Sequence, residues 1–206
     1  MERQVWDGYA DWSEVSNSGN LKMIRKRITG RTNREFQANV LHPELLGAIE
    51  DIRRSVTAHH GDAARVLDFG CGLGRNGASL RGNFGRNIGL DLPGMIVELR
   101  KLPAALPYDA LYDDLAALVV AEDVDVCFDS VVFQHIVDRD FCQSIIDRLI
   151  LMPRLRYVIS LCNVSVARGW ASIPLMLAKS GWEEIQKFED LESFSRPHTY
   201  RVLRKI

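Results

Sequence analysis

Several features of membrane proteins and nucleic-acid-binding proteins are missing from this sequence. It has no run of about eighteen apolar residues, so we expect no membrane-spanning helix. The polar start, Met1 to Gly8, lacks the apolar stretch of a signal peptide, which favours a cytoplasmic protein. Lys and Arg number 26 and Asp and Glu 27, so there is no overall basic surface to hold nucleic acid. We therefore expect neither a membrane nor a nucleic acid as partner.

Cysteines are few and scattered. The 206 residues contain four, with no CxxC pair and no cluster of His and Cys. Zinc-binding patterns need such spacing, so we predict no metal site. We expect reduced thiols that pack as small apolar groups. The four are Cys71, Cys127, Cys142 and Cys162.

Short apolar runs alternate with helix-like segments from residue 65 onward. This alternation predicts an α/β fold with a doubly wound, mostly parallel sheet of seven strands. No helix separates the last two strands, so we expect them to form an antiparallel hairpin at one edge. The expected helices after residue 65 cover 77–81, a segment from Pro93, 139–152 and 173–179. The expected strands cover 66–69, 87–91, 110–112, 124–128, 156–162, 182–188 and 199–203.

The first sixty residues differ from the rest in pattern. We predict an N-terminal helical extension or lid over 1–60 and one structural unit over 61–206. Trp6, Tyr9 and Trp12 recur at near-helical spacing, which suits either a core or an aromatic lid over a ligand. The basic tract 22–34 is either a solvated face or a site for an anionic acceptor. Apolar residues within 45–52 have the spacing of an amphipathic helix.

The most informative local pattern is RVLDFGCGLGR at 65–75. A short apolar strand leads to Asp68, and Gly70, Gly72 and Gly74 follow at every second position. Open α/β sheets build nucleotide sites from a strand, a tight glycine turn and a helix. A carboxylate beside that turn would repel a pyrophosphate, but it can accept hydrogen bonds from an ammonium group. Capping of the turn's own amides is the alternative role for Asp68.

Four motifs in order resemble those of the class I S-adenosylmethionine-dependent methyltransferases, over roughly residues 64–206. They are VLDFGCGLG at 66–74, IGLDLPGM at 88–95, YDDLAAL at 112–118 and DVCFDSVVFQHI at 125–136. The C-terminal GWEEI and YRVLR segments are similar to the reversed edge hairpin of that family. The resemblance implies a Rossmann-like fold, S-adenosylmethionine as cofactor and transfer of its methyl group.

The resemblance also implies which residues hold the cofactor. In that family the glycine turn lies against the methionine part, and the acidic residue before it lies close to the amino group. Asp91 would bind the ribose hydroxyls, unless it only caps a helix, and Leu92 and Met95 would flank the adenine. Asp114 would meet the adenine amino group, with the Leu115 amide nearby. The implied cofactor-binding residues are Asp68, Gly70, Cys71, Gly72, Gly74, Asp91, Leu92, Met95, Asp114, Leu115, Asp129 and Ser130.

The site of the methyl acceptor has less pattern to define it. Asp129 and Ser130 are expected just past the fourth strand, near the methyl group. A hydroxyl acceptor needs a general base, for which His135 and Asp129 are the catalytic candidates, whereas an amine needs only a site that favours its neutral form. A structural histidine is the alternative role for His135, and a common one at the start of a helix. We expect O- or N-methylation of a small molecule, whose pocket would include Tyr9, Trp12, Gln134 and Asn163.

Two other functions share part of these motifs. A nicotinamide-dependent oxidoreductase also has a strand, a glycine turn and an acidic ribose ligand. Asp68 before the glycines, and Arg75 where a further glycine would stand, argue against that function. A non-catalytic methyltransferase-like partner protein is the second alternative, and the intact set of motifs argues against it.

Overall fold

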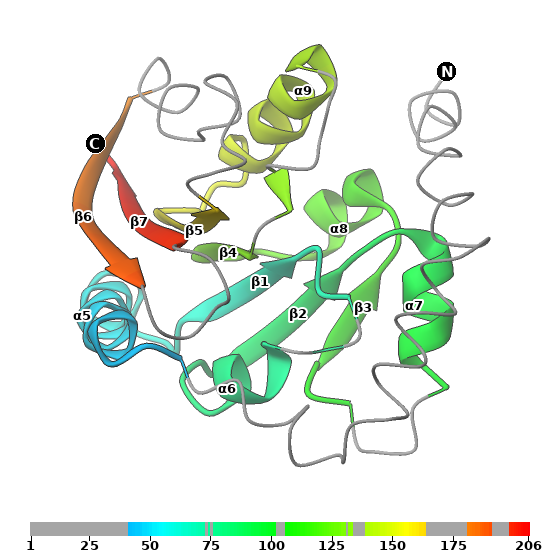
Figure 1. Cartoon of the computed structure of the whole chain (residues 1–206), viewed down its shortest axis with the longest axis horizontal. Coiled ribbons are helices and arrows are strands. Elements are labelled where there is room, and N and C mark those ends of the chain that lie inside the picture. The colour runs from blue at the N-terminus through cyan, green and yellow to red at the C-terminus, as the bar shows by residue number, and fades with distance from the viewer. Residues whose placement is uncertain are drawn as a thin grey trace. The chain divides into compact units, whose positions relative to one another are not determined.

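Seven strands cross the described part of the chain (Figure 1). The computed structural model describes residues 41–72, 74, 76–101, 106–130, 132–133, 139–163, 181–190 and 198–206. The strands are β1 (Arg65–Phe69), β2 (Arg86–Leu90), β3 (Ala110–Tyr112), β4 (Val126–Ser130), β5 (Tyr157–Asn163), β6 (Trp182–Asp190) and β7 (His198–Lys205). The described helices are α5 (Pro43–His60), α6 (Gly77–Arg81), α7 (Pro93–Leu99), α8 (Leu115–Ala121) and α9 (Arg139–Ile150). None of these helices has the length and apolar content needed to cross a membrane.

The sheet has the strand order β3-β2-β1-β4-β5-β7-β6. The first five strands pair in parallel, and β7 pairs antiparallel with both β5 and β6. Parallel neighbours need long crossover connections, which the intervening helices supply. This arrangement confirms the predicted α/β fold, with a mostly parallel seven-stranded sheet and an antiparallel hairpin at its C-terminal edge.

The strand β4 starts two residues later than the sequence predicts. Asp129 and Ser130, expected just past its end, are therefore its last two residues. Before the strand, the Asp125 N–H donates to the Arg65 carbonyl at 3.0 Å, and the Asp125 carboxylate accepts the Arg65 N–H at 2.8 Å. Hydrophobicity could not reveal this start, because Val124 is as buried as the strand residues that follow.

The helix α5 begins and ends at recognisable signals. Pro43 occupies its first turn, and the His42 side chain accepts the Glu44 N–H at 3.3 Å. Gly61 closes the helix with a φ of 75°, a conformation that glycine adopts without strain. The predicted amphipathic helix is confirmed, and its buried residues recur every three to four positions: Leu45, Ala48, Ile49, Ile52 and Val56.

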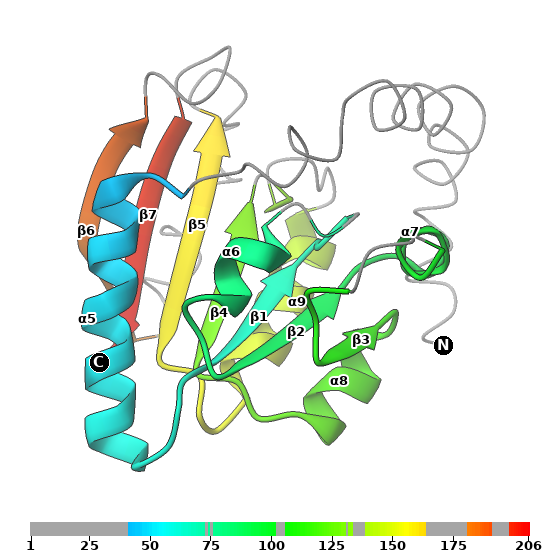
Figure 2. The same cartoon turned by 90° about the horizontal axis from the view of Figure 1, so that it is seen from below.

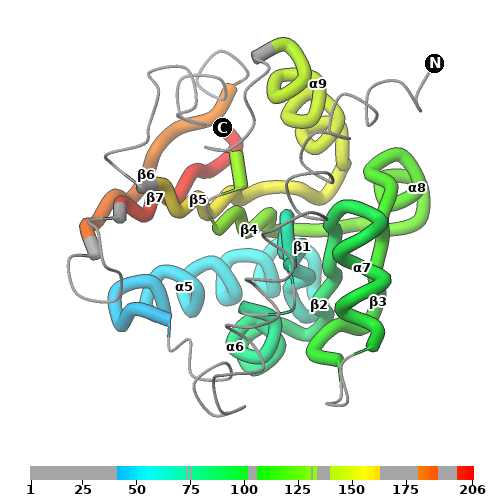
Figure 3. The backbone as a smooth tube through the Cα atoms, turned by 45° about the vertical axis from the view of Figure 1, so that its right-hand side comes forward, coloured from blue at the N-terminus to red at the C-terminus, as the bar shows by residue number. Residues whose placement is uncertain are grey.

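Helices cover both faces of the sheet (Figures 2 and 3). The helices α5 and α6 lie on one face and α9 on the other. Alternate strand residues point to the α5 face, because side chains along a strand alternate between the two faces of a sheet. Those in the core with α5 include Val66, Val126, Phe128, Ile159 and Val202. Strand residues of opposite parity, Cys127 and Val158, line a small apolar cavity with Ile146 and Leu149 of α9.

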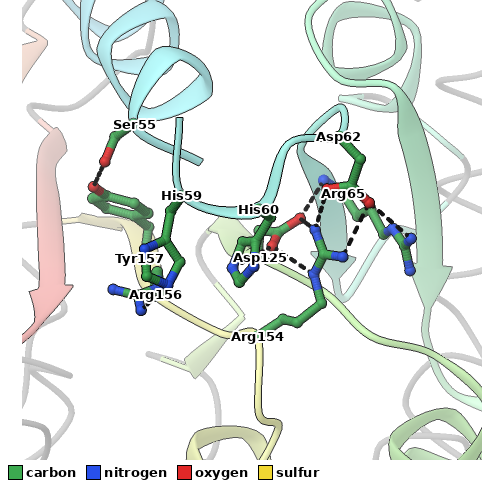
Figure 4. A network of polar contacts seen from close by, with 9 residues as sticks. All are labelled: Ser55, His59, His60, Asp62, Arg65, Asp125, Arg154, Arg156 and Tyr157. Carbon is green, nitrogen blue, oxygen red and sulfur yellow. Dashed lines mark hydrogen bonds and ion pairs between the residues drawn. The ribbon is translucent and has the colours of Figure 1, made fainter. Parts of the chain in front are cut away.

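A network of charged residues joins the amino ends of the central strands (Figure 4). At its centre the Asp125 carboxylate, with 0% of its side chain exposed, accepts hydrogen bonds from Arg154 Nε at 3.0 Å and Nη2 at 3.3 Å. Arg154 also donates to both oxygens of Asp62, at 2.6 and 3.0 Å. The ring of His60, at the end of α5, places its Nε2 3.6 Å from Asp125 Oδ1. The network thus ties together the segments that lead into β1, β4 and β5.

No disulfide joins any of the four cysteines, all of which lie in the described ranges, and three of them are buried. Cys71, Cys127 and Cys142 lie in the apolar interior, where burial raises the pKa of each thiol. Cys162 is only partly buried. Over the described ranges, no group of three or more His, Cys, Asp or Glu side chains is arranged to hold a metal ion.

Candidate ligand site at the strand crossover

The chain reverses its direction across the sheet between β1 and β4. These two strands are neighbours in the order β3-β2-β1-β4-β5-β7-β6, although β2 and β3 lie between them in sequence. In open α/β sheets, ligands bind outside the carboxyl ends of the strands at such a crossover. The carboxyl ends of β1, β2 and β4 here carry most of the residues that the sequence nominated.

The glycine turn follows β1 directly and is hydrogen-bonded to β2. The N–H groups of Gly70 and Cys71 both donate to the Leu90 carbonyl, at 2.8 and 3.0 Å. The three glycines have positive φ angles, 72° at Gly70, 53° at Gly72 and 82° at Gly74, which other residues adopt only with strain. The turn therefore needs glycine at all three positions.

The glycines differ in what surrounds them. A Cβ at Gly70 would lie 2.1 Å from Cγ2 of Val132, and one at Gly74 would lie 3.4 Å from side chains of Leu99 and Pro107. A Cβ at Gly72 would meet no described atom within 4 Å. Gly72 thus presents open backbone, as a bound ligand would require, while Gly70 and Gly74 pack against the protein.

Asp91 connects the end of β2 to this turn. Its Oδ2 accepts the Gly72 N–H at 2.6 Å, and its Oδ1 accepts the Leu92 N–H at 2.7 Å. Burial raises the pKa of Asp91, and these two backbone hydrogen bonds oppose the rise. Leu92 and Met95, at the start of α7, are partly exposed beside it. The contacts of these three residues with a cofactor stay a prediction.

Asp68 is completely buried in β1, with 0% of its surface exposed. Its Oδ2 accepts the hydroxyl of Tyr108 at 2.6 Å, and its Oδ1 has no hydrogen-bond partner among the described residues. Burial raises the pKa of Asp68 to about 7; the Tyr108 hydrogen bond lowers it, and the charges of Asp91 and Asp129 raise it further. An unpartnered buried oxygen costs stability unless a ligand uses it.

Asp129 differs from Asp68 in that both of its oxygens are engaged. Its Oδ1 accepts the N–H groups of Val132 at 2.9 Å and Phe133 at 3.3 Å, and its Oδ2 accepts the Ser160 hydroxyl at 2.8 Å. Burial raises the pKa of Asp129 to about 7, and the same three hydrogen bonds oppose the rise. The carboxylate therefore holds the turn after β4, while the neighbouring Ser130 is only partly buried.

Asp114 and Leu115 lie at the start of α8, after β3. Asp114 is exposed and caps the helix, with its Oδ1 accepting the Ala116 N–H at 2.8 Å. Leu115 is buried at 2% exposure. An adenine contact for this pair stays a prediction.

Several nominated residues lie outside the described part of the chain. Tyr9, Trp12, Gln134 and His135 belong to this group, as do the basic tract 22–34 and the expected helix 173–179. Asn163 is the last residue of β5, and its side chain is likewise outside the described set. The predicted acceptor pocket and general base therefore stay predictions.

Two residues of the site were missed from the sequence, Tyr108 and Ser160. Ser160 had a signal, because it is a small polar residue in the middle of the apolar run of β5, and a buried polar group needs a partner. Tyr108 had none, because it lies in an irregular segment before β3 with no periodicity to place it.

Three acidic side chains lie at the crossover, and the described residues provide no ion-pair partner for them. Asp68, Asp91 and Asp129 lie at the carboxyl ends of three neighbouring strands, and the first carries the repulsion of the other two. None of the ion pairs found between described residues involves any of the three. Buried carboxylates are normally paired or protonated, so this arrangement suits a ligand that brings positive charge.

Comparisons with known proteins agree on the fold. Neither a protein-family model nor a curated protein sequence matches the chain. The structure is similar to magnesium protoporphyrin IX methyltransferase (ChlM) from Synechocystis PCC 6803 with bound S-adenosylmethionine, with a TM-score of 0.59 and 18% identity, over 92% of this chain and 93% of that one. It is also similar to the N-methyltransferase NodS from Bradyrhizobium japonicum WM9 in complex with S-adenosylhomocysteine, with a TM-score of 0.55 and 15% identity, over 84% and 95% of the two chains.

A third similar structure is the bifunctional kinase-methyltransferase WbdD, with a TM-score of 0.56 and 18% identity, over 79% of this chain and 39% of that one. At such low identities the likeness concerns the fold. The chain has the Rossmann-like fold of the class I S-adenosylmethionine-dependent methyltransferases, as its motifs predicted.

Proposed function

We propose that this chain is an S-adenosylmethionine-dependent methyltransferase that methylates an oxygen or nitrogen of a small molecule. The observation that carries the proposal is the uncompensated acidic cluster of Asp68, Asp91 and Asp129 around an open glycine turn. S-adenosylmethionine carries an ammonium and a sulfonium group, so it would supply the missing positive charge. A dinucleotide would instead bring a pyrophosphate, which these carboxylates repel.

The residues at the crossover fit this cofactor. The free Oδ1 of Asp68 would accept a hydrogen bond from the amino group, and the open backbone at Gly72 would lie along the methionine part. Each Asp91 oxygen accepts one N–H and has a lone pair left for a ribose hydroxyl. Leu92 and Met95 would flank the adenine. When bound, the cofactor supplies an electrophilic methyl group, so the protein has mainly to align the acceptor.

The acceptor is held, in this proposal, by residues around the turn after β4. Asp129 accepts the Val132 and Phe133 N–H groups and so anchors the start of the segment that leads to Gln134 and His135. With its oxygens engaged in this way, Asp129 suits a role in holding that segment, which leaves His135 as the better candidate for a general base. Tyr9, Trp12 and Asn163 complete the proposed pocket. That nucleic acid is not the acceptor, and that the protein is cytoplasmic, stay predictions.

The first test is direct binding of the cofactor. Isothermal titration calorimetry should show binding of S-adenosylmethionine and S-adenosylhomocysteine, and a ligand at a hundred times its Kd should add about 2.7 kcal/mol to stability. NADH should neither bind nor show altered fluorescence. Binding of NADH in place of S-adenosylmethionine would favour the oxidoreductase. No binding of either ligand, with a stoichiometric protein partner, would favour the non-catalytic alternative.

A second prediction concerns the release of protons when S-adenosylmethionine binds. Because burial raises the pKa of Asp68 to about 7, part of this carboxyl is protonated in the free protein at neutral pH. An ammonium group favours the ionised form, so binding should release a fraction of a proton at pH 7. Affinity should then fall as the pH drops below 7. Calorimetry in two buffers with different ionisation enthalpies measures this release.

The matched control for proton release is Asp68→Asn. Its amide oxygen can still accept the Tyr108 hydroxyl, but it has no proton to release. Protons that are exchanged independently of the Asp68 charge appear equally in both proteins and cancel in the difference. Equal proton release by the wild type and Asp68→Asn would contradict the assignment of the amino group to Asp68.

A further inference from the structure

Tyr108 belongs to none of the motifs that indicated the cofactor, yet it makes the one side-chain hydrogen bond found on Asp68 in the described part of the chain. Its hydroxyl donates to Asp68 Oδ2 at 2.6 Å, and only Oδ1 is left without a partner among the described residues. A carboxyl group rotates freely about its bond to Cβ unless a partner selects one orientation. The hydroxyl therefore fixes the plane of the Asp68 carboxylate, and with it the direction in which the second oxygen points.

The ring of Tyr108 is held by glycines on two sides. A Cβ at Gly77 would lie 2.7 Å from both Cζ and the hydroxyl oxygen of Tyr108, and a Cβ at Gly89 would lie 3.2 Å from its Cδ1. Both distances are shorter than an ordinary carbon contact, so no larger residue fits at Gly77 with the ring in place. Gly77, at the start of α6, thus makes room for Tyr108 and Pro107, whereas Gly89, inside β2, borders Tyr108 but lies nearer to Leu111.

The segment that carries Tyr108 is bound to β2 through one buried residue, Asn87. The Asn87 side-chain amide donates to the Pro107 carbonyl at 2.7 Å, and its backbone N–H donates to the Asp109 carboxylate at 2.8 Å. The Asp109 N–H donates back to the Asn87 carbonyl at 2.8 Å. These bonds hold the residues on both sides of Tyr108, so its hydroxyl has a defined position.

We propose that Tyr108 is a positioning residue for the cofactor: its hydroxyl orients the Asp68 carboxylate so that Oδ1 faces the amino group of S-adenosylmethionine. The inference rests on the proposed function, because it assigns a ligand to Asp68. It adds a residue that acts through Asp68 and from outside the glycine motif. It also gives one reason for the glycine at Gly77, where a Cβ would collide with the Tyr108 ring.

The charges around Asp68 make this hydroxyl important for the ionised form. Titratable groups face Asp68 from each neighbouring element: Cys71 in the turn, Asp91 after β2, Asp129 and Cys127 on β4, and Tyr108 itself. None of these groups is cationic. Burial and the two carboxylates raise the pKa of Asp68, and the hydrogen bond from Tyr108 lowers it. Without the hydroxyl, Asp68 would hold its proton to a higher pH and would accept an ammonium group less well.

The test is Tyr108→Phe, which keeps the ring between the glycines and removes only the hydroxyl. Removing the hydroxyl takes away the hydrogen bond that lowers the pKa of Asp68, so less of the carboxyl is ionised at pH 7 and we expect roughly fivefold to tenfold weaker binding of S-adenosylmethionine. The pH at which affinity is half lost should move upward. The difference from wild type should narrow as the pH rises toward 9.

Tyr112→Phe is the matched control. The Tyr112 hydroxyl also donates to a carboxylate, Glu122 at 3.0 Å, but on β3 and away from Asp68. It should change neither the affinity nor the pH profile. A purely structural role for the Tyr108 hydroxyl would lower stability without moving the pH profile, so that profile separates the two roles.

A double-variant comparison removes the remaining ambiguity. If the hydroxyl acts through the Asp68 charge, Tyr108→Phe should weaken binding much less in an Asp68→Asn background than in the wild type. An equal loss in both backgrounds, or an unchanged pH profile in Tyr108→Phe, would overturn the inference while leaving the proposed function intact. Failure of the wild-type protein to bind S-adenosylmethionine would overturn both.

Discussion

Asp91→Ala is expected to weaken binding of S-adenosylmethionine by at least about a hundredfold. In the structure the Asp91 carboxylate accepts the N–H groups of Gly72 at 2.6 Å and Leu92 at 2.7 Å, and both oxygens have lone pairs left for the two ribose hydroxyls. Two hydrogen bonds to a charged group contribute about 1.5–3 kcal/mol each. Since about 1.4 kcal/mol corresponds to a tenfold change in affinity, their loss accounts for the expected effect.

Asp91 also holds the glycine turn, so the variant needs a control for the fold. Asp113→Ala serves this purpose, because Asp113 is an exposed acidic residue in the turn after β3, and its loss changes the net charge equally. Both variants should give the wild-type circular dichroism spectrum, and only Asp91→Ala should lose binding by calorimetry. An Asp91→Ala protein that is folded and binds within about threefold of wild type would rule out the ribose role.

The mostly parallel sheet and its antiparallel edge could be predicted from the sequence because both depend on local patterns. The run 156–162 is apolar on both faces, as a central parallel strand must be, and the structure has β5 at Tyr157–Asn163. The missing helix before the last strand predicted the antiparallel edge. The first and last residues of the strands were predicted less accurately than the strands themselves. The polar contacts of Asp125 delay the start of β4, and such contacts are formed between distant segments that a local pattern does not show.

The sequence identified residues of the candidate site, but not what each of them contacts. The glycines were recognised together, yet only Gly72 faces open space, because Val132 packs against Gly70 and side chains from before β3 pack near Gly74. Asp68 and Asp129 look alike in sequence, as acidic residues in apolar strands. Their partners distinguish them: Asp129 has donors on both oxygens, and Asp68 has one oxygen free.

Tyr108 shows most clearly what a single sequence does not contain. Its position depends on a buried amide, Asn87, about twenty residues earlier, and on space at Gly77 and Gly89. Each of these residues has an ordinary local explanation, as a strand residue or a helix start. Only the folded structure shows that these residues lie together and position the Tyr108 hydroxyl against Asp68.

Asp125→Ala is expected to have the largest effect on stability, a loss of about 3–5 kcal/mol, measured by chemical denaturation without ligand. The Asp125 carboxylate is fully buried and accepts hydrogen bonds from the Arg65 N–H and from two nitrogens of Arg154 (Figure 4). Removing it leaves the Arg65 N–H without its acceptor. It also leaves Arg154, whose side chain is 17% exposed, with Asp62 as its remaining partner in the network.

Asp51→Ala is the matched control for this loss. Asp51 pairs with Arg54 at 2.9 Å on the surface of α5, where their side chains are 77% and 70% exposed, and water replaces such a pair at little cost. Its removal should change stability by no more than about 0.5 kcal/mol. The folded Asp125→Ala protein should still bind S-adenosylmethionine with wild-type affinity, because Asp125 lies at the amino ends of the strands whose carboxyl ends form the site. A loss of affinity in the folded variant would contradict this separation, and a stability change as small as that of Asp51→Ala would contradict the role of the network in the fold.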